Sequence, residues 1–230
     1  AVVGSGPAGL AAAAQLNYAG HSVTVYERDD APGGLLRYGI PDFKLEKWVV
    51  ERRVNLLKEE GINFITGCEI GVNISLQDLH NNVDAVVLAG GSTVPRDLAI
   101  PGRNLKGIYF AMQFLKQQNK KVANKTFSEA NINVANKKVL VIGGGDTGSD
   151  CIGTSNRQKA AQVVQFELMP MPPKERNEKM PWPSYPMLLK TTSSHEEGAE
   201  REWSIATKEF IGNDKGELTG VKTVKIEWGN

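Results

Sequence analysis

The sequence has no long apolar run, little net charge and only two cysteines. No stretch of about 18 or more apolar residues occurs, so no segment is expected to span a membrane. Lys and Arg number 27 and Asp and Glu number 26, so the formal net charge is +1. That balance gives no electrostatic case for binding nucleic acid or an anionic membrane surface. A charged segment followed by an apolar one, the pattern of a secretory signal, is also missing.

The cysteines and histidines indicate neither a metal site nor acid–base catalysis. Cys68 and Cys151 lie far apart and form neither a metal-ligand spacing nor a CxxC redox pair. So few cysteines favour a reducing compartment, and a cytoplasmic protein is expected. His21, His80 and His195 occur in unrelated contexts, and we expect surface or turn positions for them. We therefore predict no metal ligands and no catalytic side chain.

Glycine is abundant, at 24 residues, and it gathers in clusters. Two clusters, Gly4–Gly9 and Gly143–Gly148, each follow a short apolar run and precede a helix-compatible stretch. This arrangement predicts an α/β fold with two Rossmann-like dinucleotide-binding domains, built on parallel sheets with short antiparallel strand insertions. Because a strand normally has about five residues, we expect Ala1 to be a cut edge of a longer protein.

A proline- and glycine-containing stretch at residues 94–107 suggests a linker between the two domains. We place the first domain, which is incomplete, at residues 1–105 and the second at residues 106–230. The expected helices span residues 10–19, 45–60 and 110–118, with another from residue 149 onward. The expected strands span residues 22–27, 84–89, 139–142, 163–168, 203–211 and 218–228, and residues 170–186 are expected to form a loop.

The first glycine cluster has the spacing Gly4-x-Gly6-x-x-Gly9, which suits a phosphate-binding turn. The first glycine permits the tight turn, the second lets a pyrophosphate approach, and the third lets helix and strand pack closely. Glu27 ends the next strand, 18 residues after Gly9, where a carboxylate can accept hydrogen bonds from ribose hydroxyls. A carboxylate there disfavours a 2′-phosphate, so FAD or NAD fits better than NADP. The alternative is a glycine-rich turn that binds nothing. The expected contacts are Gly4, Ser5, Gly6, Pro7, Ala8, Gly9, Glu27, Arg28 and Gly90.

Adjacent glycines at Gly33 and Gly34 follow the second expected strand. Without side chains, the backbone there can pass close to a flat ligand, so Gly34 and Leu35 are candidate contacts. Arg37 and Lys44 are nearby cations. They are either solvated surface charges or contacts of a phosphate or flavin.

The second glycine cluster repeats the pattern, but its preference for a nucleotide is ambiguous. Glu167 lies 19 residues after Gly148, which favours NAD. Arg157, Lys174 and Arg176 are close in sequence, and arginine can accept a 2′-phosphate. NADPH and NADH therefore both remain open. The candidate contacts are Gly143, Gly145, Asp146, Thr147, Gly148, Arg157 and Arg176.

The sequence resembles flavoproteins with paired dinucleotide-binding domains and, within them, the small-chain (beta) family of glutamate synthases. The resemblance runs from Ala1 to the end of the chain. It is carried by Gly33–Pro41, Ala89–Gly91, Pro95–Leu98, Gly143–Cys151, Met180–Pro183, Lys208–Gly212 and Val224–Trp228. One departure is the strand ending Ala-Gly-Gly-Ser, where the family usually has Ala-Thr-Gly.

The resemblance implies that the first domain binds FAD and the second binds NADPH or NADH. It further implies a flavoprotein oxidoreductase that passes hydride from NADPH to FAD, as the electron-input subunit for L-glutamate biosynthesis and ammonia assimilation. The implied partner is the large (alpha) subunit of glutamate synthase. The family's 4Fe–4S clusters are expected only in a region before Ala1, and its closing Gly-Asp motif only beyond the chain's last residue.

Two other interpretations stay open at this point. The same core occurs in ferredoxin–NADP transhydrogenase-type subunits and in the electron-input part of dihydropyrimidine dehydrogenase. A chain whose FAD site is incomplete could also be a cofactor-poor, non-catalytic fragment.

Overall fold

The computed structural model describes residues 1–184 and 187–229, which divide into two compact units. The first unit contains Ala1–Pro95 and Leu115–Ser128, and the second contains Arg96–Phe114 and Glu129–Asn230. A single boundary at residue 105 was expected from the sequence, and the structure differs from it. The segment Leu115–Ser128 returns to the first unit, because its polar side chains bind the loop that follows the second strand of that unit.

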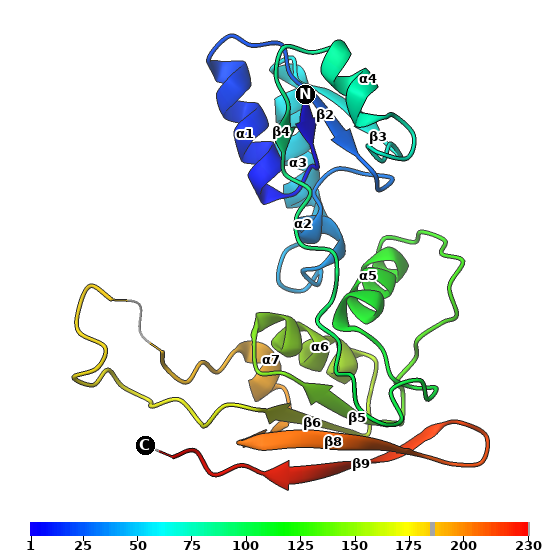
Figure 1. The fold of residues 1–230 in the computed structure, drawn as a ribbon, viewed down its shortest axis with the longest axis vertical. Helices are drawn as coiled ribbons and strands as arrows, with labels where there is room; N and C mark the ends of the chain where they lie inside the picture. The colour runs from blue at the N-terminus through cyan, green and yellow to red at the C-terminus, as the bar shows by residue number, and fades with distance from the viewer. Residues whose placement is uncertain (185–186, 230) are drawn as a thin grey trace. The chain divides into compact units, whose positions relative to one another are not determined.

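The first unit is built on a four-stranded parallel sheet (Figure 1). Its strands are in the order β3-β2-β1-β4, and every neighbouring pair is parallel. Parallel strands bring their carboxyl ends to one edge, where ligands of open α/β sheets bind. The strands are β1 (Val2–Val3), β2 (Thr24–Glu27), β3 (Asn63–Thr66) and β4 (Val87–Leu88).

Helices of the first unit alternate with these strands along the chain. The core joins the β-branched faces of β1 and β2 to the apolar stripes of the helices, and it contains Val2, Leu10, Ala13, Val23, Val25, Leu57 and Ile62. The helices are α1 (Pro7–Tyr18), α2 (Leu35–Tyr38), α3 (Lys47–Glu59), α4 (Leu76–Asn81) and α5 (Ala111–Val122), the last of which contributes residues to both units.

The second unit repeats the βα pattern on a smaller scale. Its three strands pair in the order β5-β6-β7, all parallel, and β8 and β9 form a separate antiparallel hairpin. The buried face of α6 carries mostly small residues, which let the helix lie close to the sheet. The elements are β5 (Lys138–Ile142), α6 (Asp146–Arg157), β6 (Gln162–Glu167), α7 (Ser193–Glu196), β7 (Glu200–Trp203), β8 (Ile205–Gly212) and β9 (Leu218–Lys225).

The predicted α/β class with parallel sheets is confirmed, and so are most of the predicted elements. The strand expected over residues 203–211 is instead two strands. Ser204 has a positive φ of 59°, which breaks the extended chain between β7 and β8. The short helices α2, α4 and α7 were not predicted. The expected loop at residues 170–186 has no helix or strand as far as Ser184, and residues 185 and 186 lie outside the described residues.

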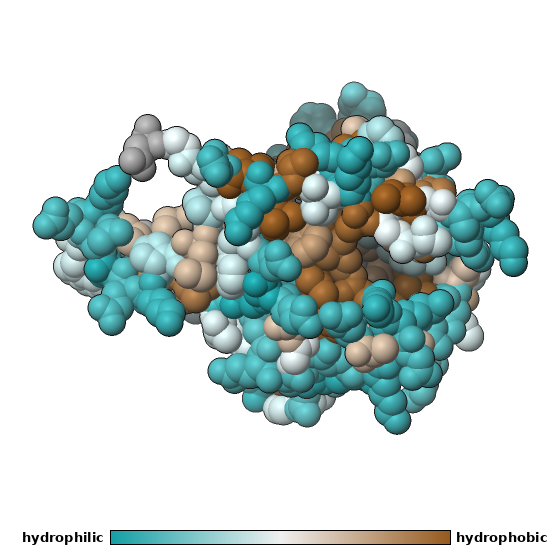
Figure 2. Space-filling model, turned by 90° about the horizontal axis from the view of Figure 1, so that it is seen from below, coloured by the Kyte–Doolittle hydropathy of each residue, from teal (hydrophilic) through white to brown (hydrophobic). Residues whose placement is uncertain are grey.

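Apolar side chains also occur on the surface. On the side drawn in Figure 2, apolar side chains are visible in patches among polar ones. Several exposed apolar residues belong to the segment that follows β6, namely Leu168, Met169, Met171, Trp182 and Met187. None of the helices in the described part of the chain is both long and apolar enough to cross a membrane.

Candidate functional site: two glycine loops

The first glycine loop joins β1 to α1, and its three glycines have different surroundings. A Cβ on Gly4 would lie 2.4 Å from the carbonyl oxygen of Ala89, and a Cβ on Gly9 would lie 1.9 Å from the carbonyl oxygen of Gly4. Backbone contacts therefore require both glycines. At Gly6, by contrast, no atom of the described residues lies within 4 Å of the Cβ position. This open space at a helix N-terminus fits a pyrophosphate.

Glu27, the last residue of β2, lies beside this loop and is hydrogen-bonded to it. It is buried, and its Oε2 accepts hydrogen bonds from the Ser5 N–H (3.1 Å) and from the Ser5 hydroxyl. Its Oε1 accepts a bond from the Asp29 N–H (2.8 Å). The carboxylate is thus fixed beside the loop, where sequence reasoning expected a ribose contact. Each carboxylate oxygen can accept more than one hydrogen bond, so capacity for a ribose hydroxyl remains.

The Gly33–Gly34 cluster lies directly against the first loop. A Cβ on Gly34 would come within 2.8 Å of the Gly6 Cα, and the Gly33 N–H donates to the Ser5 hydroxyl oxygen (2.9 Å). Leu35 then begins α2. Gly90 also lies beside the first loop, since a Cβ on Gly4 would lie 3.2 Å from the Gly90 Cα. The structure therefore brings these candidate residues together around one loop.

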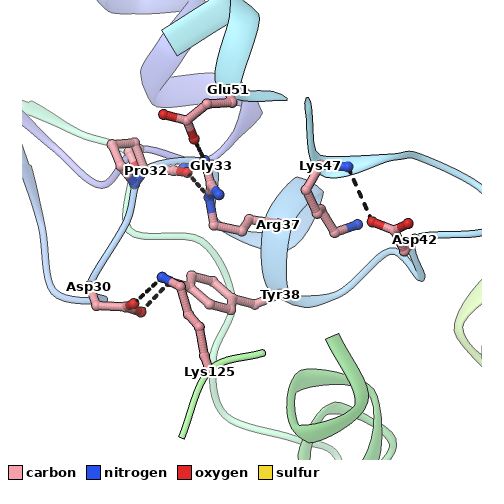
Figure 3. Close-up of polar contacts among 10 residues, drawn as sticks. Asp30, Pro32, Gly33, Arg37, Tyr38, Asp42, Lys47, Glu51 and Lys125 are labelled. Carbon is pink, nitrogen blue, oxygen red and sulfur yellow. Dashed lines mark hydrogen bonds and ion pairs between the residues drawn. The ribbon is translucent and has the colours of Figure 1, made fainter. Parts of the chain in front are cut away.

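The candidate cations of the first unit are placed differently. Figure 3 shows Arg37 pointing toward Pro32 and Glu51, and its Nε donates to the Pro32 carbonyl (2.6 Å) while Nη2 pairs with the Glu51 carboxylate (2.6 Å). Arg28 is exposed directly after β2. Lys44 lies in a turn whose backbone N–H donates to the Pro41 carbonyl (3.0 Å). Arg37 therefore has a structural role in bracing the loop.

The segment Leu115–Ser128 holds the loop that follows β2. Lys116 pairs with Asp29 (2.6 Å), and Asp30 accepts hydrogen bonds from both Lys125 and Tyr38 (Figure 3). Burial raises the pKa of Asp30, but the hydrogen bonds from Lys125 and Tyr38 outweigh that effect and lower the pKa to about 2. Burial and the Asp30 carboxylate hold the pKa of Tyr38 above its ordinary value. We call Asp30, Tyr38 and Lys125 the loop clamp.

The second glycine loop, between β5 and α6, repeats the first. Gly143 has a positive φ of 118°, and a Cβ on Gly148 would lie 2.4 Å from the Gly143 carbonyl oxygen. At Gly145 no atom of the described residues lies within 4 Å of the Cβ position. Asp146 and Thr147 form the start of α6, where free N–H groups are available to a phosphate.

Glu167 stands beside the second loop as Glu27 stands beside the first. Its Oε2 accepts the Gly144 N–H (2.5 Å) and its Oε1 accepts the Met169 N–H (3.1 Å). A Cβ on Gly144 would lie 2.3 Å from Oε2, so this arrangement requires glycine at position 144. The carboxylate is therefore fixed beside the second loop, where the sequence led us to expect a nucleotide contact.

The two candidate arginines of the second unit do not join this loop. Arg157 is in the last turn of α6, opposite the glycine loop, and pairs with both carboxylate oxygens of Glu197. A helix of this length, with a rise of about 1.5 Å per residue, separates its two ends by roughly 16 Å. Arg176 donates to the carbonyls of Met180 and Ser184 at 2.9 Å each, within its own loop.

Two residues near the second loop escaped the sequence analysis. Gln165 is buried in β6 and its Nε2 donates to the Gly143 carbonyl (2.8 Å). His195, expected at the surface or in a turn, is buried in α7 and lies 3.2 Å from Gln165 through Nε2. The polar residues Gln165 and Glu167, two positions apart at the end of β6, were the available signal for Gln165.

Other reactive groups do not form a second kind of site. Cys68 and Cys151 are both free and buried, and burial together with the Asp150 carboxylate raises the pKa of the Cys151 thiol to about 12. Within the described residues, no group of three or more His, Cys, Asp and Glu side chains could hold a metal ion. The two glycine loops are therefore the main candidate sites.

Two α/β units, each with a glycine loop and a carboxylate fixed beside it, define the architecture of two-nucleotide oxidoreductases. The chain belongs to the pyridine nucleotide-disulphide oxidoreductase family, whose model matches residues 1–224.

Several sequence relatives of the chain are glutamate synthases. The chain is 54% identical over 233 residues to glutamate synthase [NADH] of Saccharomyces cerevisiae, covering 99% of the chain and 11% of that protein. It is 52% identical over 230 residues to the glutamate synthase [NADPH] small chain of Mycobacterium tuberculosis, covering 98% of the chain and 47% of that protein. The chain thus spans less than half the length of either relative.

Solved structures agree on the fold. M. tuberculosis FprA in complex with NADPH superposes with a TM-score of 0.68 at 17% identity, covering 96% of this chain and 66% of that one. Thioredoxin reductase of T. acidophilum gives a TM-score of 0.62 at 16% identity, covering 97% of this chain and 69% of that one. At these identities, the likeness concerns architecture alone.

Proposed function

We propose that the chain passes hydride from NADPH to FAD, as the electron-input part of a glutamate synthase. The observation that carries this proposal is the repetition of one arrangement in two units: an open glycine at a helix N-terminus, Gly6 or Gly145, beside a fixed carboxylate, Glu27 or Glu167. Two such sites in one chain suit a reaction between two dinucleotides. The names and identities of the relatives support the reaction and its place in glutamate synthesis.

The first loop would hold FAD. The start of α1 and the open space at Gly6 would receive its pyrophosphate, and Glu27 would accept from its ribose. Gly34, which lies against the loop, and Leu35, which follows it at the start of α2, would line the path toward the flavin. FAD supplies the ring that accepts hydride when it is bound, and the residues of the chain bind and orient it.

The second loop would hold the nicotinamide dinucleotide. Gly145 leaves room for the pyrophosphate, and the first turn of α6, with Asp146 and Thr147, presents its N–H groups. Hydride transfer between two rings needs alignment rather than a proton donor, so no catalytic side chain is assigned.

The proposed partner is the large subunit or domain of glutamate synthase, supported by the relatives whose names include "small chain". A cytoplasmic location is proposed on the two free thiols, Cys68 and Cys151, which suit a reducing compartment.

An anaerobic titration tests the proposed reaction. The chain, loaded with FAD, is titrated with NADPH and with NADH while the flavin absorption band is followed. We expect bleaching by at least one of them, and slower bleaching in a Gly145→Ala variant because its methyl group occupies the pyrophosphate space. A chain that retains FAD and is bleached by neither nucleotide would contradict the proposal, as would a chain that binds no FAD.

NADH is the second candidate donor, favoured by the placement of Glu167. A fixed carboxylate accepts from a free 2′-hydroxyl and repels a 2′-phosphate. Glu167→Gln removes the charge, so the ratio of the NADH to the NADPH dissociation constant should rise about tenfold, the effect of one hydrogen bond to a charged group. Fluorescence titration measures both dissociation constants. An equal ratio in the E167Q variant and in the unsubstituted chain would show that Glu167 does not recognise the ribose.

A further inference from the structure

A line of buried polar groups connects helix α7 to the second glycine loop. The Thr192 N–H lies 3.1 Å from His195 Nδ1, His195 Nε2 lies 3.2 Å from Gln165 Oε1, and Gln165 Nε2 lies 2.8 Å from the Gly143 carbonyl oxygen. His195 and Gln165 are 8% and 2% exposed, so water competes little for these bonds. Thr192, the N-cap residue of α7, also contacts the Ser149 hydroxyl through its own hydroxyl (2.6 Å).

The direction of every bond in this line follows from its ends. A backbone N–H can only donate, so Nδ1 of His195 accepts from Thr192 and carries no proton. Neutral imidazole then has its proton on Nε2, which donates to Gln165 Oε1. The amide of Gln165 is thereby oriented with its nitrogen toward the loop, where it donates to the Gly143 carbonyl. His195 thus selects the amide orientation that the loop needs.

The Gly143–Gly144 peptide is held from both of its sides. Its carbonyl accepts from Gln165 and its N–H donates to Glu167, two residues that alternate along β6. Because a peptide is planar, fixing both groups fixes the rotation of the whole unit. Neither glycine has a side chain that would restrict this rotation. The orientation of the next N–H groups, at Gly145 and the start of α6, depends on it.

We propose that His195 is a positioning residue for the nicotinamide dinucleotide: through Gln165 it orients the Gly143–Gly144 peptide of the phosphate loop. The proposal rests on the proposed function of the second loop. It adds two residues, on α7 and β6, that no glycine motif contains. His195 does not touch the nucleotide in this role, and it acts through Gln165.

A simpler role for His195 would be to cap α7, because its Nδ1 also accepts the Thr192 N–H. Two substitutions test the roles. His195→Asn places an oxygen near the position of Nδ1 and keeps the cap, but it is too short to reach Gln165. His195→Gln places an amide nitrogen near the position of Nε2 and keeps the bond to Gln165. Glutamine at this third helical position can also accept the N–H of the N-cap residue, so this substitution is the rescue variant, and H195N alone distinguishes the positioning role from the cap.

The experiment measures NADPH and NADH dissociation constants by fluorescence titration, and amide hydrogen exchange of residues 143–148 in the nucleotide-free chain. H195N should bind the preferred nucleotide about five- to tenfold more weakly, the effect of one buried hydrogen bond, and should exchange faster at the loop. H195Q should retain most of the affinity and the protection. The control is His80→Asn, an exposed site on α4, which should match the unsubstituted chain.

Gln165→Glu provides a second route if H195N fails to fold. Glutamate still accepts from His195 Nε2 but cannot donate to the Gly143 carbonyl, so the same loss is expected. The proposal is overturned if H195N or Q165E leaves loop exchange unchanged, or if H195Q is weakened more than H195N. If the unsubstituted chain binds neither nucleotide, the proposed function fails. In that case, the amide exchange of residues 143–148 alone tests whether His195 positions the loop.

Discussion

At position 145, a methyl group would meet no atom of the described residues within 4 Å, whereas at position 148 it would press on the Gly143 carbonyl and the Gln165 amide. One glycine is therefore required by the fold, and the other leaves space that the fold itself does not fill. The same contrast separates Gly9 from Gly6 in the first loop. In both loops, the glycine with open surroundings stands at a helix N-terminus, where a phosphate of the proposed dinucleotides would fit.

A matched pair of alanine variants tests this distinction. Gly148→Ala should lower the free energy of unfolding by about 2 kcal/mol or more, because backbone atoms must move. Gly145→Ala should change it by less than about 1 kcal/mol, since position 145 is an N-cap with ordinary dihedral angles. Denaturant unfolding of the nucleotide-free variants gives both values.

For nucleotide binding the order should be the reverse of that for stability, because position 145 borders the proposed pyrophosphate site. G145A should lose most of its affinity for NADPH and NADH although its fold is intact, which titration of the folded variant measures. If G145A binds both nucleotides as the unsubstituted chain does, Gly145 does not border the pyrophosphate.

Residue spacing in the sequence predicted which loop residues lie together, but it did not predict the positions of the arginines. Gly4, Gly9 and Glu27 were predicted as one cluster, and they lie together because a βαβ unit has a nearly fixed length. Arg157 is close to Gly148 in sequence, yet a helix separates them along its axis. Whether two residues nine positions apart in the sequence lie close in space depends on the element that lies between them.

At the scale of elements, the loop clamp is the clearest electrostatic feature of the first unit. The pKa of Asp30 is lowered to about 2 in the folded chain, below its ordinary value of 3.8. A lowered carboxyl pKa stabilises the fold above the ordinary value, and this stability is lost as the pH falls from about 4 toward 2. The carboxylate is about half exposed, so its contribution is at most about 1 kcal/mol.

Asp30→Asn should therefore be less stable than the unsubstituted chain at pH 7, by up to about 1 kcal/mol. The difference should shrink below pH 4, where the unsubstituted chain also begins to lose the charge on Asp30. Urea unfolding at neutral and acidic pH measures this difference. A gap that persists unchanged at pH 3 would show that the substitution disturbs packing rather than charge.

Most of the longer elements with apolar runs were predicted, and several short elements were missed. β5 and β6 follow from their β-branched residues, and α3 follows from its spaced apolar positions. β7 reads Glu-Arg-Glu-Trp, which has no apolar run, and it exists because β6 offers a parallel edge. α7 has four residues and depends on the cap at Thr192. β7 and α7 are two of the elements that were missed, and neither has an apolar pattern that would predict it from the sequence.

At the scale of the molecule, the chain forms two compact units, and each unit has its own parallel sheet. A ligand stabilises the part of a protein that binds it. NADPH or NADH should therefore slow amide exchange mainly in β5, the second loop, α6 and β6, whereas FAD should slow it in β1, the first loop and β2. Hydrogen–deuterium exchange of the whole chain with each ligand separately measures this. Protection by NADPH mainly in the first unit would contradict the assignment of the loops.

The two loops reach the same backbone form through different connections. In the first, the Ser5 hydroxyl joins Glu27 to the Gly33 N–H. In the second, Gly144 has no side chain and Gln165 holds the carbonyl instead. The loops are consequently not interchangeable parts. Transplanting residues 143–148 into positions 4–9 would preserve every motif glycine. It would also put a glycine in place of Ser5, so the hydrogen bonds of the Ser5 hydroxyl to Glu27 and to the Gly33 N–H would be lost.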